Sequence, residues 1–320
     1  MANDVATVQS STTLGGWTNW ALMEVSTDFS TALLEMDDYQ KKCVQDAMSA
    51  IFQLVVNDPK ADLNRIDKSN LRDILKNCAS LKLSATNYPK EVYFQLRNKK
   101  VGDNWVQQVE MGIEGDGYDA LLRNFGVDVK TVHNVWIVYE GDDFTFPKHR
   151  GLEVEPPLWE PKGLSTKAIR VVYPVEMKSG YVEYLIAERE GVKGNLSAHI
   201  RNNLMNETFG ICENRFKASK EQLAQIKARK DEIFNALSQC QTLDAMLACP
   251  EARPFMSPSW LESTESMIIR KMRNNATRRV PKNYNTIQSQ SILQLDDVYK
   301  SSKVEIEENE NSTPFLIEQN

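Results

Sequence analysis

Six basic residues near the C-terminal end of the chain form the clearest candidate for a binding site. They fall within thirteen positions, from 270 to 282, and no acidic residue separates them. They are Arg270, Lys271, Arg273, Arg278, Arg279 and Lys282. A row of positive charges without internal counter-ions suits the phosphates of a nucleic-acid strand. Positions 271, 274, 278 and 282 share one helical face if the helix continues to Pro281. A solvated helix face, or pairing with carboxylates elsewhere, is the alternative.

A second basic cluster lies beside aromatic residues in the first third of the chain. Arg97, Lys99 and Lys100 fall between Tyr93 and Trp105. The basic side chains are candidates for phosphate contacts, and aromatic rings can stack on or wedge between unpaired bases. Packing in the core is an equally good interpretation of the two aromatic residues, because they occur in alternating patterns.

The residue patterns of common catalytic and metal sites are missing from the sequence. The chain has three histidines, at His133, His149 and His199. We place His133 in a strand and His199 in a helix, and no carboxylate lies at metal-ligand spacing from either, which favours packed or surface histidines. The glycine-rich run 112–117 includes Glu114 and Asp116. Both would face a bound phosphate, so the run predicts a tight turn from strand to helix.

The composition is typical of a globular protein. Hydrophobic residues make up 41% of the chain, which leaves ample material for a core. The five cysteines are odd in number and form no CxxC pair, which argues against a disulfide framework or a structural zinc site. The longest apolar stretches, such as 51–56, fall well short of the ~20 residues of a bilayer span. No basic residue precedes Lys41, so we expect no secretory signal and a soluble, cytoplasmic protein without membrane contact.

The net charge of −6 hides an uneven distribution along the chain. Six acidic residues and no basic ones precede Lys41, and five acidic residues follow Lys303. The segment from 41 to 302 therefore holds 37 basic and 33 acidic residues, a net charge of +4. A polyanion responds to a local patch more than to the total charge, so the acidic total does not exclude nucleic-acid binding.

Hydrophobic periodicity predicts an α+β fold, with N-terminal helices, a central antiparallel sheet with a short helix, and C-terminal helices. Apolar residues at helical spacing predict helices over 33–56, 68–83, 118–125, 219–248 and 260–276. Alternating residues predict strands over 91–97, 105–111, 129–139, 168–176 and 181–188. The first two strands form a hairpin with Lys99 and Lys100 at its tip. We expect a disordered segment over 1–30, one core over 31–290, and an acidic disordered tail over 291–320.

Several short motifs follow one another in an order that is found in a known family. They are Asn77 to Leu83 before a strand, Val109 to Gly112 before Ala120 to Gly126, Val138 to Phe146, and Trp260, Met267, Lys271, Arg273, Arg279 and Pro281. Together they resemble the RecT family of phage single-strand annealing proteins, over about 40–190 and again over 257–282. Ile113 replaces the usual aromatic residue of the family, 115–117 looks like an insertion, and 206–256 is expected to be a helical insert.

The resemblance implies an ATP-independent protein, without catalytic chemistry or cofactor, that coats single-stranded DNA and pairs it with a complementary strand. Such proteins hold the annealed duplex during homologous recombination. They assemble as homo-oligomeric rings or helical filaments and usually work beside a 5'-3' exonuclease. We expect Trp105 to contact DNA and assign phosphate contacts to a set of basic residues. These are Arg97, Lys99, Lys100, Arg123, Lys271, Arg273, Arg278 and Arg279.

The acidic end of the chain carries an apolar tip. Four glutamates lie between 305 and 310, and Phe315, Leu316 and Ile317 follow them. This arrangement resembles the partner-recruiting tail of single-strand DNA-binding proteins. The tip could dock on an exonuclease or on a host single-strand DNA-binding protein, or the acids could occupy the basic groove until DNA displaces them. An inert tail is the remaining alternative.

Two other classes of function stay open on the sequence alone. The first is a non-catalytic interaction protein whose basic helix binds a protein or RNA. The second is a hydrolase that uses Glu140, Asp142 or Asp143, although adjacent side chains on an extended strand point in opposite directions and do not easily share a site.

Overall fold

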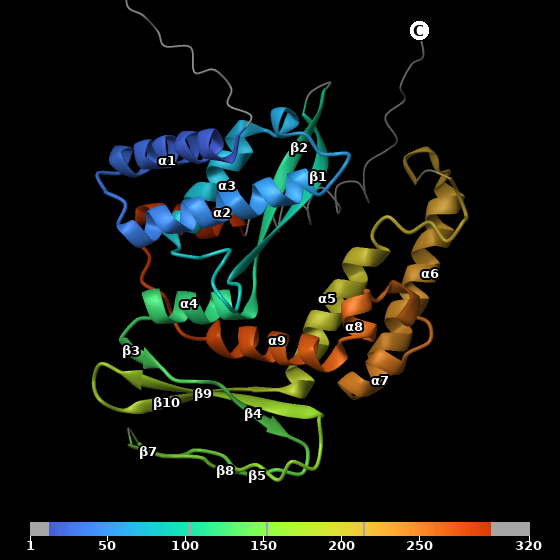
Figure 1. Cartoon of the computed structure of the whole chain (residues 1–320). Coiled ribbons are helices and arrows are strands. Elements are labelled where there is room, and N and C mark those ends of the chain that lie inside the picture. Colours follow the sequence, from blue (N-terminus) through green and yellow to red (C-terminus); the bar gives the residue numbers. More distant parts are fainter. Residues whose placement is uncertain (1–12, 102–103, 152, 214, 296–320) are drawn as a thin grey trace, which may run out of the picture. The chain divides into compact units, whose positions relative to one another are not determined.

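The chain forms two compact units in the computed structural model, which describes residues 13–101, 104–151, 153–213 and 215–295 (Figure 1). The first unit contains the chain up to Val127 and the segment that begins at Val280. The second unit contains Asp128–Arg279. The sequence predicts one core over 31–290, and this division differs from that expectation because the chain leaves the first unit and later returns to it.

Three helices build one side of the first unit. They are α1 (Leu14–Thr31), α2 (Asp38–Val56) and α3 (Lys68–Ser80), with a short 3-10 turn η1 (Leu63–Arg65) before α3. The expectation of disorder over 1–30 is wrong for the described part of that segment, because α1 buries Trp17, Ala21, Val25 and Phe29 on one face. Helix α2 begins at Asp38, where Asp37 and Gln40 form a capping box.

The predicted hairpin lies against these helices. Strands β1 (Val92–Val101) and β2 (Asn104–Ile113) pair antiparallel, from Val92 opposite Ile113 to Val101 opposite Asn104. Phe94, Leu96, Val109 and Met111 face the helical core. The side chain of Asn70 on α3 accepts a hydrogen bond from the Val109 N–H at 2.7 Å and donates one to its carbonyl at 3.2 Å.

The returning chain completes the first unit. Helix α4 (Gly115–Phe125) follows the hairpin, and the N–H of Val127 donates to the Pro281 carbonyl at 2.9 Å. Residues 286–295 are helical, and Ser291 shares a hydrogen bond of 2.7 Å with Ser80. The predicted disordered tail therefore begins in a helix, and its remainder, 296–320, lies outside the described residues.

A four-stranded sheet is the centre of the second unit. Strand β9 (Ala168–Met177) pairs with β10 (Val182–Glu188) along one edge and with β3 (Val129–Val132) and β4 (Trp136–Tyr139) along the other, all antiparallel. The single strand predicted over 129–139 is broken at 133–135, so His133 lies in a loop, where its N–H donates to the Pro174 carbonyl at 3.0 Å. Helix α9 (Thr264–Thr277) covers one face of the sheet (Figure 1).

Two small strand pairs replace the loop that the sequence predicts before residue 162. Strand β5 (Asp143–Thr145) pairs with β8 (Leu158–Glu160), and β6 (Lys148–Arg150) pairs with β7 (Glu153–Glu155). The Arg170 guanidinium of the sheet lies 4.4 Å and 4.3 Å from the ring centres of Phe144 and Phe146. These contacts join the small strands to the face of the sheet opposite α9.

Helices of different lengths complete the second unit. They are η2 (Arg189–Val192), α5 (Lys193–Leu204), η3 (Arg215–Lys217), α6 (Lys220–Gln239), α7 (Leu243–Ala248), η4 (Arg253–Phe255) and α8 (Pro258–Leu261). The helix predicted over 219–248 is interrupted between α6 and α7. Helix α9 ends at Thr277, close to the predicted end at 276. The helical face that would require a continuation to Pro281 therefore does not form, and Arg278 and Arg279 lie beyond the last turn of α9. No helix in the described ranges is long and apolar enough to cross a membrane.

Candidate nucleic-acid interface

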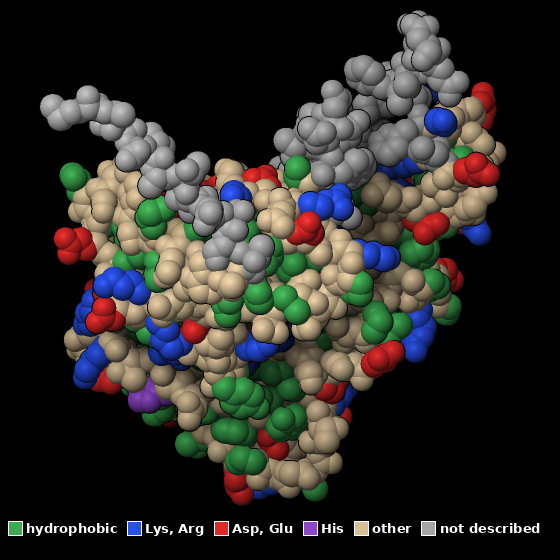
Figure 2. All heavy atoms as spheres, turned by 45° about the horizontal axis from the view of Figure 1, so that its top comes forward, with side chains coloured by type: hydrophobic (Ala, Val, Ile, Leu, Met, Phe, Trp, Pro, Cys, Tyr) green, Lys and Arg blue, Asp and Glu red, His purple; other side chains and the backbone are tan. Residues whose placement is uncertain are grey.

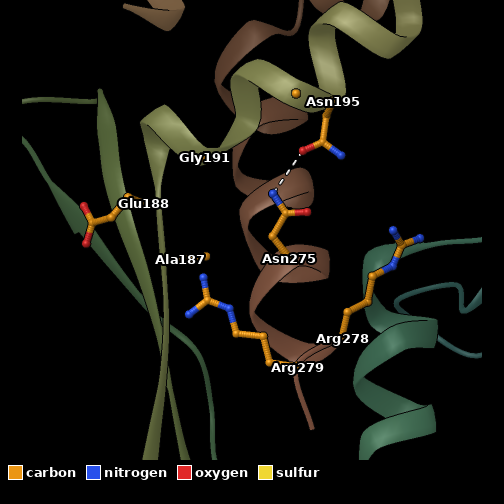
Figure 3. Close-up of a pocket in the computed structure, with 8 residues that line it drawn as sticks. Ala187, Glu188, Gly191, Asn195, Asn275, Arg278 and Arg279 are labelled. Carbon is orange, nitrogen blue, oxygen red and sulfur yellow. Dashed lines mark hydrogen bonds between the residues drawn. The ribbon is translucent and has the colours of Figure 1, made fainter. Parts of the chain in front are cut away.

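An open pocket of about 440 Å³ lies within the second unit, where the end of β10, the start of α5 and the end of α9 meet (Figure 3). Eight residues line it: Ala187, Glu188, Gly191, Gly194, Asn195, Asn275, Arg278 and Arg279. Two of these, Arg278 and Arg279, belong to the basic run that the sequence singles out, and both are exposed.

A buried arginine beside the pocket joins the end of β10 to α7 and α9. Arg189 directly follows β10 and is 6% exposed. Its guanidinium donates to Glu265 of α9 at 2.8 and 2.9 Å and to Asp244 of α7 at 2.7 and 3.1 Å. Burial alone would lower the pKa of Arg189, but the hydrogen bonds to the two carboxylates outweigh it and raise the pKa. The charge therefore stays in place and ties the strand end to the helices.

The lining of the pocket includes two exposed guanidinium groups and one carboxylate. Glu188 lines the pocket, and its carboxylate points away from both arginines (Figure 3). That carboxylate accepts hydrogen bonds from Arg170 at 2.6 and 3.1 Å, on the other face of the sheet. Arg278 and Arg279 thus bring two exposed guanidinium groups to the pocket, and these are groups that can bind a phosphate.

Two glycines and two amides form the opposite part of the pocket. A Cβ built on Gly191 or Gly194 would meet no atom within 4 Å, so the backbone there borders open space. The Nδ2 of Asn275 on α9 donates to the Oδ1 of Asn195 on α5 at 3.0 Å (Figure 3). The site therefore combines charge, accessible backbone and a fixed amide pair, which is the donor set used to bind phosphates and bases.

The structure separates the other predicted residues of the basic run from this pocket. Arg273 is half-buried, and its Nε donates to the Tyr173 hydroxyl at 2.8 Å, so it joins α9 to the sheet. Lys271 is also half-buried and lies near His199, whose pKa is lowered chiefly by burial and further by this lysine. Neither residue lines the pocket.

The remaining predicted DNA contacts belong to the first unit. Arg97 is exposed on β1 and pairs with Glu110 at 2.5 Å, and Arg123 is exposed on α4. Lys99, Lys100 and Trp105 belong to the paired strands of the hairpin near its tip. The structure describes the backbone of these three residues and not their side chains. Phe315, Leu316 and Ile317 also lie outside the described residues.

Sequence reasoning missed the non-basic half of the pocket. Gly191, Gly194 and Asn195 fall at the junction of a strand and a helix, and Asn275 follows the basic residues of α9 by two to five positions. The available signal was the spacing of two glycines directly after a predicted strand. It is a weak signal by itself, because glycines at such junctions commonly serve only the turn.

The histidine and carboxylate candidates for catalysis have structural partners. The Nε2 of His199 accepts a hydrogen bond from the Ser257 N–H at 3.1 Å and its ring packs near Trp260. The Asp142 carboxylate accepts from the N–H groups of Tyr139 and Lys162, both at 2.9 Å, and from Trp159 Nε1 at 3.0 Å. In the part of the chain that the structure describes, no group of three or more His, Cys, Asp or Glu is arranged to hold a metal ion.

Charges of both signs are interspersed over the surface seen in Figure 2, where Lys and Arg side chains lie beside Asp and Glu. Many of the basic residues in the middle of the chain form ion pairs with carboxylates, such as Lys82 with Asp37 and Lys130 with Glu176. The positive net charge of the middle segment therefore gives local rather than broad basic character on this face. The arginine pocket is therefore a better-defined candidate for a nucleic-acid contact than a broad basic surface.

Comparison with protein-family models finds no match for the chain, and searches of curated proteins and of solved structures find none either.

Proposed function

We propose that the protein binds single-stranded DNA without ATP and anneals it to a complementary strand, with the pocket at the end of α9 as one of its phosphate contacts. The observation that carries the proposal is the pair of exposed guanidinium groups, Arg278 and Arg279, that line one pocket together. In this proposal the protein works as a homo-oligomer, a ring or a filament, that holds the annealed duplex beside a partner exonuclease.

Annealing places simple demands on a protein. Two strands of like charge must approach, so their phosphates need partial neutralisation, and the bases must remain able to pair. Arginine suits this role because its planar guanidinium binds a phosphate through two parallel hydrogen bonds. The reaction itself needs no nucleophile and no general acid or base, which agrees with the structural roles of His199 and Asp142.

The direct test replaces both arginines of the pocket. The Arg278→Ala/Arg279→Ala variant should bind a single-stranded oligonucleotide more weakly, and the slope of log K against log salt should flatten by about 1.4, twice the ~0.7 expected per phosphate contact. Lys227→Ala/Arg229→Ala is the matched control, because it removes two exposed charges from α6 of the same unit. Fluorescence anisotropy over a salt series measures both slopes, and annealing of complementary strands without ATP gives the second readout. A folded arginine variant with unchanged slope and annealing would refute the proposal.

Gly194 offers a second test that leaves both arginines in place. A side chain at this position extends into open space, and Glu in the first turn of a helix is favourable for the helix dipole. Gly194→Glu should therefore fold normally and repel a phosphate, whereas Gly194→Gln controls for size. We expect weaker DNA binding for the Glu variant than for the Gln variant, with the difference shrinking as salt is raised.

A further inference from the structure

The amide pair of the pocket has hydrogen-bonding capacity beyond its own contact. One Asn275 Nδ2 hydrogen and the Asn195 Oδ1 are used in the 3.0 Å bond between α9 and α5. The Oδ1 of Asn275 and the Nδ2 of Asn195 point to the same side, the side on which Arg278 lies (Figure 3). The pair thus presents one acceptor and one donor next to each other, and rotating both amides exchanges the two roles without removing either.

We propose that this pocket holds one whole nucleotide of the strand, with its phosphate on Arg278 and Arg279 and the hydrogen-bonding edge of its base on Asn195 and Asn275. The inference rests on the proposed DNA binding and adds a base contact to it. Each of the four bases carries a donor beside an acceptor on its pairing edge, so an amide pair of this kind contacts any base but not an abasic sugar.

The dimensions and the fixed geometry of the pocket support a nucleotide rather than a bare phosphate. Its volume of about 440 Å³ falls in the range of about 300–1,000 Å³ typical of small-molecule pockets, whereas two arginines alone would suffice for a phosphate. The bond between Asn275 and Asn195 holds both amides in position before any ligand binds, which lowers the entropy cost of the contact. The glycine backbone at 191 and 194 leaves room beside them.

A base held in this way is withdrawn from pairing while it is bound. The contact is compatible with annealing if it involves one nucleotide in the footprint of each protein molecule and leaves its neighbours exposed. It would hold one base in a fixed orientation without reading its identity, whereas the phosphate contacts position the backbone of the strand.

The test compares a base-bearing oligonucleotide with an abasic one of the same length on the same variants. Wild-type protein should bind the abasic strand more weakly. Asn275→Ala and Asn195→Ala should each weaken binding of the base-bearing strand roughly 3- to 10-fold, the value of one or two hydrogen bonds, and leave abasic binding unchanged. Asn202→Ala, at an exposed position of α5, is the matched control and should change neither.

The outcomes separate this inference from the proposed function. If the arginine variant loses affinity for both strands while the asparagine variants lose none, the pocket binds phosphate only and the base contact is refuted. An equal loss on both strands in Asn275→Ala and Asn195→Ala would also refute it, because that result reports a structural role of the amide pair. If the arginine variant binds both strands normally, the proposed function fails at this site.

Discussion

Gly117 and Gly194 both lie in the first turn of a helix, yet their surroundings differ. A Cβ on Gly117 would lie 2.2 Å from the backbone carbonyl oxygen of Glu91 and 2.7 Å from Cγ2 of Ile113. That carbonyl also accepts a hydrogen bond from the Glu114 N–H at 2.9 Å, so it cannot move without loss. Gly117 is thus required by the close approach of α4 to the start of β1, whereas Gly194 borders open space.

Substituting alanine at the two glycines should have opposite effects on stability. Gly117→Ala should lower the free energy of unfolding by about 1–3 kcal/mol through overpacking. Gly194→Ala should raise it by about 0.5–1 kcal/mol, because alanine restricts the unfolded chain and favours a helix. Urea denaturation of each variant beside the wild type measures both changes. Equal tolerance at the two positions would contradict the contact at Gly117.

A second residue-scale prediction concerns pH. The pKa of His199 is lowered from its ordinary value of 6.5 by burial first and by Lys271 second. The unfolded chain therefore binds a proton at a pH where the folded chain does not. Neutral His199 thus contributes fully to the free energy of unfolding above pH 6.5, and this contribution is lost as the pH falls through the lower pKa of the folded state. Urea denaturation above and below pH 6.5 should show this loss, and His199→Gln should reduce it. A variant with the same pH dependence as wild type would place the titrating group elsewhere.

At the scale of elements, α1 carries a prediction that the sequence pattern did not make. Phe29 is 2% exposed and belongs to the core cluster that α1 shares with α2 and α3. Phe29→Ala should lower the free energy of unfolding by about 3–5 kcal/mol, the range for a large aromatic side chain in a core. Thr27→Ala, exposed on the same helix, should change it little. If Phe29→Ala were as mild as the control, α1 would not be part of the folded core.

The elements also show what local pattern can and cannot predict. The hairpin of β1 and β2 and the pair β9 and β10 follow from alternation, because each has one buried face. The apolar positions of α1 repeat every four residues, but Ser, Thr and Asn between them give the segment the composition of a disordered end. The break at 133–135 coincides with a tertiary contact, the hydrogen bond from the His133 N–H to the Pro174 carbonyl, which no local pattern indicates. The arginines of the pocket lie in a visible basic run, whereas Asn195 is 80 positions from its partner and no local signal joins them.

At the scale of the whole molecule, the charge at the end of the chain should affect DNA binding. Residues 303–320 hold five acidic residues and one basic residue, a net charge of −4. If this segment competes with DNA for basic residues, deleting it should tighten DNA binding at low salt. At high salt the deletion should change binding little, because salt screens the attraction between the acidic segment and the basic residues. Docking on a partner predicts instead that DNA affinity is unchanged and that Phe315→Ala alone abolishes partner recovery. Anisotropy at two salt concentrations and co-purification distinguish the two results, and an unaltered truncation would favour an inert tail.

The return of the chain to the first unit has a consequence for the order in which the protein can fold during synthesis. The N–H of Val127 and the carbonyl of Pro281 are hydrogen-bonded at 2.9 Å, and Ser80 meets Ser291 at 2.7 Å, although 152 residues intervene between Val127 and Val280. A ribosome releases the early helices long before their last partner exists. The first unit therefore stays partly assembled until its last segment is made, whereas the second unit, whose described residues all fall between 128 and 279, can fold first.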